Sequence, residues 1–231
     1  MNYLIVVAGG RGERVDLGFN KIFARLGRLP LLYWTLLVFE KSKVIDQIVI
    51  SVSESDVRRV KGLLKKFGFK KVHGIIKASS SRQASTLDVL KALKSKVKKS
   101  DFVGVHNGVN PFVTGEEIKA VYNAAKRFGA ALLAQPARDT VKIADQKGLV
   151  SETPLRQYSW YAQTPQVATF GNLWKAFTKA DSDNFVGTDD AQLLERIGIK
   201  PKIVSCSSKN IKITFPEDLI TAKHILKTWT E

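Results

Sequence analysis

The sequence YLIVVAGGRGER, residues 3–14, joins an unbroken apolar run to a glycine-rich turn. The apolar run at residues 3–8 is typical of a strand that is buried on both faces of a parallel sheet. Glycines let backbone amides approach an anion closely, and arginines in the same turn add positive charge. The turn contains three glycines and two arginines: Gly9, Gly10, Arg11, Gly12 and Arg14. The stretch therefore predicts a strand followed by a turn that binds phosphate.

The rest of the chain alternates strand and helix. Apolar, strand-like runs recur at residues 45–52, 72–77, 102–106 and 130–137. Helical segments separate them, and Thr114 with Glu117, like Thr214 with Glu217, has the spacing of a capping box. Strands that alternate with helices of this length imply parallel units with helices on both faces of one sheet. We therefore expect an α/β fold, a doubly wound and mostly parallel sheet, in a single domain over residues 1–231.

The segment at residues 141–170 interrupts this alternation. Its apolar and polar residues alternate around a glycine turn, and no helical period is present. This pattern predicts an antiparallel β-arm inserted into the α/β domain.

The composition limits the classes of function. The 37 Lys and Arg against 21 Asp and Glu give a formal charge of +16, which attracts polyanions, but lysine-rich helix surfaces account for most of it. Arginine and aromatic residues are not interleaved as in single-strand binders. The apolar stretches are too short to span a membrane, and no basic region precedes the first one as in a signal peptide. A single cysteine, Cys206, and three histidines argue against a disulfide and a Cys/His metal site. We expect a cytoplasmic protein that binds neither nucleic acid nor membranes.

Ligands of open α/β sheets bind beyond the carboxyl ends of the strands, where the loops of this chain carry basic residues. These are Lys21 after the first strand, Arg138 and Lys142 after the fifth, and Lys209 and Lys212 near the C-terminus. The first turn lacks the Gly-Lys-Ser/Thr ending of a P-loop and the third glycine of a dinucleotide fingerprint. A tight turn without a ligand is an alternative for the glycines alone. Together with the cations, the glycines favour phosphate binding.

Further motifs follow in order along the chain: RQAST at residues 82–86, PARDTVK at 136–142, TPQ at 164–166, TDDA at 188–191 and NIKITFPEDL at 210–219. With the opening VAGGRGERV and the following NKI, their order and spacing resemble the cytidylyltransferases that act on 2-C-methyl-D-erythritol 4-phosphate in the non-mevalonate isoprenoid pathway. The related ribitol-5-phosphate cytidylyltransferases are similar. The resemblance covers nearly the whole chain. It implies a Rossmann-like nucleotidyltransferase fold and transfer of a cytidylyl group from CTP to a sugar-alcohol phosphate, with release of pyrophosphate.

The resemblance also implies roles for individual residues. The expected catalytic residues, which neutralise charge on the α-phosphate, are Arg14, Lys21 and Lys212. The expected CTP-binding residues are Ala8, Gly9, Gly10, Arg11, Gly12, Ser79, Ser80, Arg82, Ser85 and Asn107. The expected acceptor-binding residues are Arg138, Asp139, Thr140, Arg156 and Thr188. In this family the arm forms a dimer, so a homodimer is expected in which Thr140 and Arg156 reach the neighbour's acceptor site.

Two of these assignments have structural alternatives. Arg138 and Asp139 could pair with each other across the arm. Thr188 and Asp189 precede a helical segment, and a helix cap is the favoured interpretation for Thr188.

The chain departs from the family at the expected metal site. Family members read VHDAARP, with an aspartate that helps to hold Mg²⁺. Residues 105–111 of this chain read VHNGVNP, with Asn107 in place of the aspartate and Asn110 in place of the arginine before the proline. Lys209 stands at a second position that is often aspartate, and Asn20 replaces the proline of the family's PKQ motif. Mg²⁺ prefers carboxylate and phosphate oxygens, so we expect a Mg²⁺ cofactor that Asn107 binds weakly. Two interpretations stay open: an enzyme in which Lys209 supplies part of the ion's charge, and a fold whose activity is lost or redirected.

Overall fold

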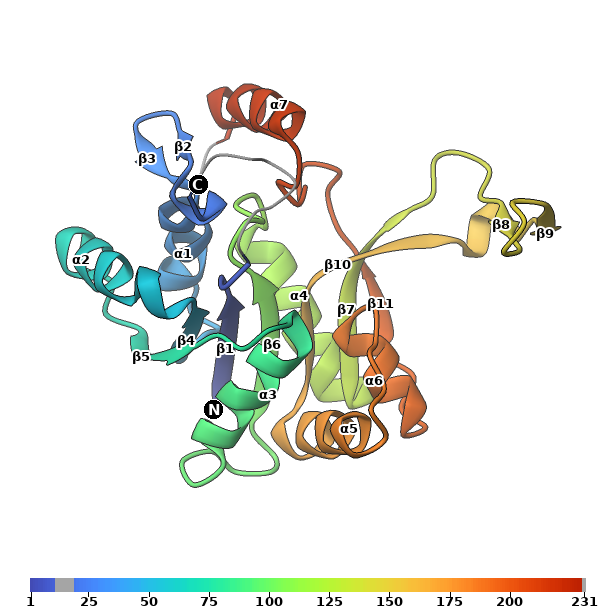
Figure 1. The fold of residues 1–231 in the computed structure, drawn as a ribbon, viewed down its shortest axis with the longest axis horizontal. Helices are drawn as coiled ribbons and strands as arrows, with labels where there is room; N and C mark the ends of the chain where they lie inside the picture. The colour runs from blue at the N-terminus through green and yellow to red at the C-terminus, as the bar shows by residue number, and fades with distance from the viewer. Residues whose placement is uncertain (11–18, 230–231) are drawn as a thin grey trace.

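A sheet of seven strands forms the centre of the computed structural model, which describes residues 1–10 and 19–229 (Figure 1). The strand order is β11–β7–β10–β6–β1–β4–β5. The strands are β1 (Asn2–Val7), β4 (Gln47–Val52), β5 (Val72–Lys77), β6 (Phe102–Asn107), β7 (Ala130–Pro136), β10 (Trp160–Thr169) and β11 (Lys202–Ser205). Neighbouring strands pair in parallel except at β10, which runs antiparallel to both β6 and β7. The prediction of a mostly parallel α/β sheet is confirmed.

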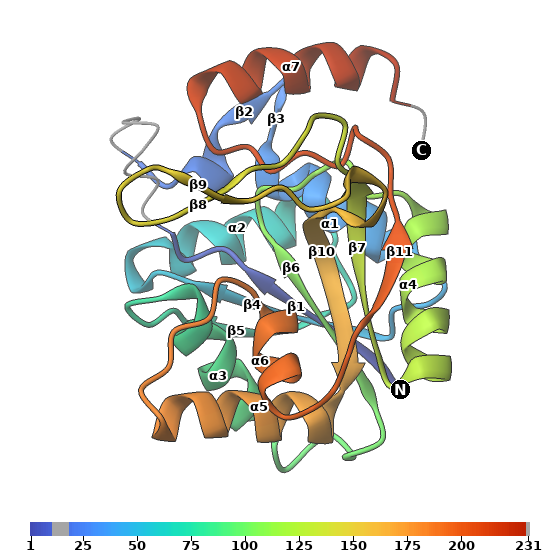
Figure 2. The same ribbon diagram turned by 90° about the vertical axis from the view of Figure 1, so that its right-hand side faces the viewer.

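Helices cover both faces of this sheet (Figure 2). The helices of one face are α1 (Leu31–Lys41), α2 (Val57–Phe67) and α4 (Gly115–Phe128), and those of the other are α3 (Arg82–Leu93), α5 (Phe170–Ser182) and α6 (Asp190–Arg196). The core is divided accordingly: Leu36 and Tyr122 belong to one buried cluster, and Leu90 and Phe177 to the other. Among the helices of the described residues, none is both long and apolar enough to cross a membrane.

The helix start at Thr114 follows the sequence pattern. The Thr114 hydroxyl accepts from the backbone N–H of Glu117 at 3.1 Å, and the Glu117 carboxylate accepts from the backbone N–H of Thr114 at 2.9 Å. This reciprocal pair satisfies two backbone donors that the first turn of α4 leaves unpaired. The predicted capping box is confirmed.

The predicted cap of the last helix, α7 (Pro216–Lys227), was wrong by one residue. The carboxylate that accepts from the backbone is Asp218 rather than Glu217, and its donors are the N–H groups of Thr214 at 2.7 Å and Phe215 at 2.8 Å. Proline favours the first helical position because its fixed φ suits the helix and it has no N–H to leave unpaired. Pro216 therefore begins α7, and the third helical position falls on Asp218.

A small third layer closes the top of the molecule in Figure 2. There α7 packs over the two-stranded pair β2 (Arg25–Leu26) and β3 (Leu29–Pro30), which follows the short helix η1 (Lys21–Phe23). The buried residues of this layer are Ala24, Leu26, Leu31, Phe112, Ile213, Ala222 and Ile225. The layer brings the C-terminal segment beside η1, where the carbonyl oxygen of Thr214 accepts from Lys21.

The segment at residues 141–170 divides into two parts. Strands β8 (Ile143–Ala144) and β9 (Val150–Glu152) form a hairpin that projects from the body of the molecule (Figure 1). After the short helix η3 (Arg156–Tyr158), β10 returns and lies inside the central sheet between β6 and β7. The projecting part is therefore shorter than the alternation of apolar and polar residues predicted, because an antiparallel strand of the main sheet shows the same alternation.

Candidate active site

A cleft of about 1460 Å³ opens beyond the carboxyl ends of β1, β4, β5 and β6. The predicted residues that line it are Ala8, Gly9, Gly10, Lys21, Ser79, Ser80, Arg82, Ser85, Asn107 and Lys212. Parallel sheets bind ligands at this edge, and the structure brings these residues together there. Three further predicted residues, Arg11, Gly12 and Arg14, lie outside the described residues.

Close backbone packing explains two glycines at this edge. A Cβ on Gly9 would lie 2.2 Å from the Cβ of Ala78, and a Cβ on Gly108 would lie 2.9 Å from the Cβ of Ala8. Both separations are shorter than two carbon atoms can approach without displacement. The loops after β1, β5 and β6 therefore touch one another at positions where a side chain does not fit.

Asn20 hydrogen-bonds both to the end of β1 and to the short helix η2 (Glu54–Asp56), which follows β4. Its amide nitrogen Nδ2 donates to the carbonyl oxygen of Ala8 and to Oδ2 of Asp56, both at 2.9 Å. Its Oδ1 accepts from the backbone N–H of Ile22 at 3.2 Å and so caps η1. This nearly buried side chain thus joins the end of β1 to the start of η1 and fixes the backbone that carries Lys21.

Serines shape the loop that precedes α3. Ser81 caps the helix by accepting from the backbone N–H of Ala84 at 3.1 Å. The Ser85 hydroxyl donates to the carbonyl oxygen of Ser81 at 2.7 Å and accepts from the backbone N–H of Ser79 at 3.0 Å. Ser85 is only 2% exposed, and its hydroxyl holds the backbone of the loop that lines the cleft.

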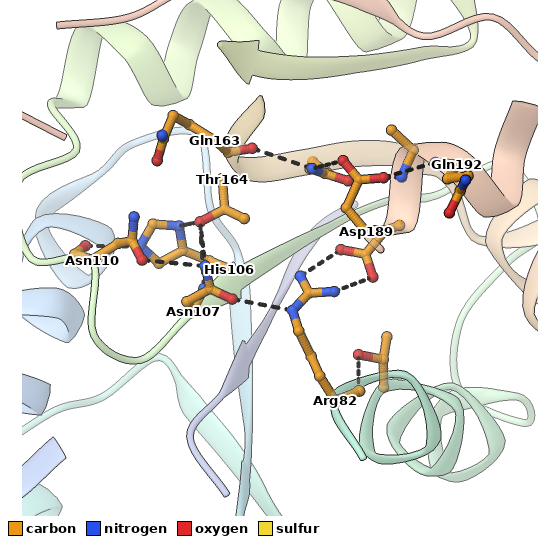
Figure 3. Close-up of polar contacts among 12 residues, drawn as sticks. Arg82, His106, Asn107, Asn110, Gln163, Thr164, Asp189 and Gln192 are labelled. Carbon is orange, nitrogen blue, oxygen red and sulfur yellow. Dashed lines mark hydrogen bonds and ion pairs between the residues drawn. The ribbon is translucent and has the colours of Figure 1, made fainter. Parts of the chain in front are cut away.

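Arg82 forms a buried ion pair at the edge of the cleft (Figure 3). Its Nη1 and Nη2 donate to Oδ1 and Oδ2 of Asp190, each at 2.7 Å, and its Nε donates to Oδ1 of Asn107 at 3.1 Å. Burial works against the charge of Arg82, but the Asp190 carboxylate outweighs it and the pKa of Arg82 is raised. The guanidinium predicted to meet CTP is therefore also part of an internal network.

His106 lies fully buried below the cleft. Its Nε2 lies 3.0 Å from the carbonyl oxygen of Asn110, which can only accept, so Nε2 carries the proton. Its Nδ1 then accepts from the hydroxyl of Thr164 at 2.9 Å. Burial is the main reason that the pKa of His106 is lowered to about 4, so the ring is neutral at pH 7.

Lys212 lines the cleft from a segment that is held at two fully buried residues. The side chain of Asn210 donates to the carbonyl oxygen of Thr164 at 3.1 Å. The backbone N–H of Ile213 donates to the carbonyl oxygen of Val109 at 3.0 Å. These anchors lie on either side of Lys212 and fix the backbone from which it reaches the cleft.

Lys21 approaches the cleft from the other end of the chain. Its Nζ donates to the carbonyl oxygen of Thr214 at 3.2 Å, so the first residue of η1 contacts the segment that carries Lys212. Lys209 lies on the same segment but is exposed and is not among the described residues that line the cleft. The two expected catalytic lysines are brought together, whereas Lys209 is not placed with them.

The predicted acceptor-binding residues lie elsewhere. All five, namely Arg138, Asp139, Thr140, Arg156 and Thr188, are exposed, and none belongs to the described lining of the cleft. Four of them lie at the base of the projecting hairpin, where Arg156 Nη1 is 3.4 Å from the carbonyl oxygen of Arg138. No ion pair joins Arg138 to Asp139 in the part of the chain that the structure describes, so the alternative of an internal pair finds no support.

The favoured interpretation of Thr188 as a helix cap was wrong. The cap of α6 is Asp189, whose Oδ1 accepts from the backbone N–H of Gln192 at 2.9 Å. The backbone N–H and hydroxyl of Thr188 donate instead to the side-chain oxygen of Gln192, at 2.8 and 3.3 Å. The helix begins one residue later than expected, because Asp189 adopts the extended backbone conformation of a cap.

The described residues do not fit a magnesium ion held by the protein itself. Among them, no three Asp, Glu, His or Cys side chains gather as a metal site. The neutral Oδ1 of Asn107 already accepts from Arg82, and the positive charge of that guanidinium opposes a second cation at the same oxygen. The expectation that Asn107 is a weak Mg²⁺ ligand is therefore not supported by the donor chemistry.

Sequence reasoning missed three residues that shape the site: Asp56, His106 and Asp190. Asp190 lies inside the TDDA motif and His106 at the end of an apolar run, so each was visible only as a polar residue next to predicted functional positions. The contacts that place them in the site join Asp56 to Asn20, His106 to Thr164 and Asp190 to Arg82, which are 36, 58 and 108 positions apart, so no local spacing reveals them. One usable signal was the charge of Asp190 three and four positions before Leu193 and Leu194, on the apolar face of the helix, because a buried carboxylate needs a partner.

The comparisons with known proteins point to one family. The chain matches a family model described as 2-C-methyl-D-erythritol 4-phosphate cytidylyltransferase over residues 2–228. Among curated proteins of that name, it is 41% identical over 224 residues to the one from Syntrophus aciditrophicus, covering 96% of this chain and 94% of the relative. It is 36% identical over 226 residues to the one from Geobacter metallireducens, covering 97% of each.

A solved structure is similar over nearly the full length. The 4-diphosphocytidyl-2C-methyl-D-erythritol synthase from Anaerococcus prevotii has a TM-score of 0.87 at 31% sequence identity, covering 98% of this chain and 96% of that chain. The similarity extends over the central sheet and its helices, since so little of either chain is left out. The chain therefore belongs to the 2-C-methyl-D-erythritol 4-phosphate cytidylyltransferase family.

Proposed function

We propose that this protein transfers the cytidylyl group of CTP to 2-C-methyl-D-erythritol 4-phosphate and releases pyrophosphate, a step in the synthesis of isoprenoid precursors. The observation that carries the proposal is the cleft at the strand ends, which Lys21 and Lys212 both line together with Gly9 and Gly10 in a chain of this family. The relatives favour this acceptor over ribitol 5-phosphate, because their names specify methylerythritol phosphate.

The chemistry is a single displacement at phosphorus. A phosphate oxygen of the acceptor attacks the α-phosphorus of CTP, and the bond between that phosphorus and the bridging oxygen of the β-phosphate breaks. The electron pair of the broken bond leaves with pyrophosphate. Negative charge builds on the oxygens of the α-phosphate during this step, so positioning and fixed positive charge supply most of the catalysis.

The cleft supplies charge from several directions. We assign Lys21 and Lys212 to the α-phosphate oxygens, because both line the cleft and their backbones are fixed by buried hydrogen bonds. Arg14 is the third cation that we assign to this group. The backbone amides of Gly9 and Gly10 are suited to the remaining phosphates, since glycine permits close approach of an anion.

The acceptor site is best completed by a second copy of the chain. Large exposed apolar side chains lie on the hairpin, at Ile143, Leu149 and Val150, and on the stretch that returns from it, at Leu155, Tyr158 and Tyr161. An apolar surface of this kind on a projecting hairpin is stabilised when a partner covers it. We therefore propose a homodimer in which each arm brings Thr140 and Arg156 to the cleft of the other subunit, where the acceptor phosphate binds.

We propose that Mg²⁺ arrives bound to the phosphates of CTP, as part of the substrate, because the described protein side chains offer it few oxygen ligands.

The cysteine content bears on the location of the reaction. We place the reaction in the cytoplasm, where the lone Cys206 stays reduced. Burial raises the pKa of Cys206 to about 12, which leaves its thiol unreactive.

The experiment that tests the proposal is pyrophosphate release from CTP, with the nucleotide product identified by mass spectrometry. We expect release only when CTP, Mg²⁺ and 2-C-methyl-D-erythritol 4-phosphate are all present, and little with ribitol 5-phosphate in its place. Faster release with ribitol 5-phosphate would assign the other acceptor. CTP binding without release from either acceptor would show a catalytically impaired homologue and overturn the proposal.

A further inference from the structure

Asn107 faces a donor on its α3 side. A guanidinium carries N–H donors and no acceptor, and Nε of Arg82 lies 3.1 Å from Oδ1 of Asn107. The other two nitrogens of this guanidinium are held by Asp190, which is 1% exposed, so the group cannot turn away. The side chain at position 107 must therefore present an acceptor to α3 (Figure 3).

Asn107 faces an acceptor on its β10 side. His106 donates through Nε2, so its Nδ1 takes the only hydroxyl proton of Thr164. The Thr164 oxygen is left as an acceptor, and the backbone N–H and Nδ2 of Asn107 lie 3.4 and 3.5 Å from it. The buried neutral histidine thus fixes which way this hydroxyl points.

Three asparagine side chains form a row in which the amide nitrogen of each faces an oxygen of the next group. Nδ2 of Asn107 donates to Oδ1 of Asn110 at 3.2 Å, and Nδ2 of Asn110 lies 3.5 Å from Oδ1 of Asn210. Nδ2 of Asn210 then donates to the carbonyl oxygen of Thr164 at 3.1 Å. Asn110 and Asn210 are fully buried, so turning either amide over would set two oxygens against each other without water to separate them.

We infer that position 107 of this chain requires an amide, and that Asn107 is a positioning residue rather than a weakened metal ligand. A carboxylate of the same shape would turn an oxygen toward Oδ1 of Asn110 and Oγ1 of Thr164, both of which accept. The row of amides ends at Asn210, two residues before Lys212, so Asn107 acts by holding the segment of that lysine against the cleft. The catalytic part of this inference rests on the proposed function.

The test replaces Asn107 by aspartate, which changes one N–H₂ group into an oxygen and leaves the shape unchanged. Asn107→Asp should unfold at a temperature several degrees lower than the unchanged protein at pH 7.5, measured by calorimetry. Asn123→Asp, the same change at an exposed position of α4, is the matched control and should leave the unfolding temperature unchanged. In the transfer reaction, Asn107→Asp should lower kcat severalfold without lowering the Mg²⁺ concentration that gives the half-maximal rate.

Two results would overturn the inference. One is an unfolding temperature for Asn107→Asp equal to that of Asn123→Asp. The other is a higher rate at a lower Mg²⁺ requirement, which would mean that Asn107 stands in for a metal-binding aspartate. The calorimetric comparison needs no turnover, so it tests the amide network even in a protein that releases no pyrophosphate, an outcome that would count against the proposed function alone.

Discussion

Arg82 and Asp190 stand 108 positions apart in the sequence, and their side chains meet in two parallel hydrogen bonds of 2.7 Å each. The pair joins the first residue of α3 to the first residue of α6 beside the cleft. Asp190 is 1% exposed and the side chain of Arg82 is 28% exposed. A charge at such a position is stabilised mainly by its partner, because water reaches it poorly.

Removing one partner of this pair should therefore destabilise the fold. We expect Asp190→Asn to lower the free energy of unfolding by about 3 kcal/mol, because Arg82 is left charged and poorly solvated. Urea denaturation measures the change. Lys179→Ala, which breaks the exposed pair with Asp183, is the control and should cost less than about 1 kcal/mol. Equal losses in the two variants would contradict the assignment of a buried pair.

Lys212 should matter for the rate of transfer and not for the fold. We expect Lys212→Ala to lower kcat about 100-fold, the usual effect of removing one group that stabilises transition-state charge. Lys209→Ala makes the same charge change three residues earlier on the exposed side of the segment, and it should change kcat less than about twofold. A large loss in Lys209→Ala would instead support the interpretation in which that lysine replaces charge of the metal ion.

Asn20 should position Lys21 through the backbone. Its φ of −62° is the angle that proline adopts, so Asn20→Pro can keep the backbone conformation while losing the bonds to Ala8 and Asp56. Asn20→Ala loses both the bonds and the restriction on φ. We expect kcat to fall in Asn20→Ala and to recover in large part in Asn20→Pro, as measured by pyrophosphate release at saturating CTP. Equal losses in both variants would show that the hydrogen bonds themselves are required.

His106 should make stability depend on pH in a defined window. Its pKa is about 4 in the folded protein against 6.5 in an unfolded chain, so between these values the unfolded chain binds a proton that the folded chain does not. Stability contributed by the neutral ring is complete above pH 6.5 and is lost as the pH falls, by about 3 kcal/mol at pH 4. Urea denaturation at a series of pH values checks this.

The His106→Gln variant provides the comparison for that titration, because glutamine does not titrate. We expect the stability of the unchanged protein to fall more steeply than that of the variant between pH 6.5 and 4. Parallel curves for the two proteins would show that His106 takes up its proton in the folded state.

The exposed apolar hairpin should determine the oligomeric state. We expect light scattering to give twice the chain mass of 25.7 kDa, and Leu155→Glu to shift the protein toward the single-chain mass. Leu155 is 66% exposed, and Ile220→Glu, at a 71% exposed position on α7, is the control. In the proposed dimer, Leu155→Glu should also raise the KM for the acceptor more than the KM for CTP. A single-chain mass for the unchanged protein would contradict the dimer.

The sequence predicted the sheet and the loops that line the cleft because both depend on local patterns. Buried parallel strands appear as continuous apolar runs, as at residues 3–8, and their carboxyl ends meet at one edge. The resemblance then supplied Lys212, which no local pattern connects with Lys21. The capping box at Thr114 was predicted because its two hydrogen bonds join residues only three positions apart.

The parts that the sequence did not predict depend on contacts between distant residues. Whether alternating residues belong to an arm or to a central antiparallel strand is decided by what covers them, so β10 could not be separated from the hairpin. The same limit applies to Asn107. Beside the family pattern it looks like a lost carboxylate, and only the positions of Arg82, Asn110 and Thr164 show what its amide contacts.

The contact between Lys21 and Thr214 has a consequence for how the protein is made. The ribosome releases Lys21 early, but Thr214 and the neighbouring Lys212 follow only about 190 residues later. A nascent chain that has not reached this segment lacks both the second lysine and the carbonyl oxygen that accepts from the first. Consumption of CTP should therefore begin only after the segment around Lys212 has been translated and has folded against η1.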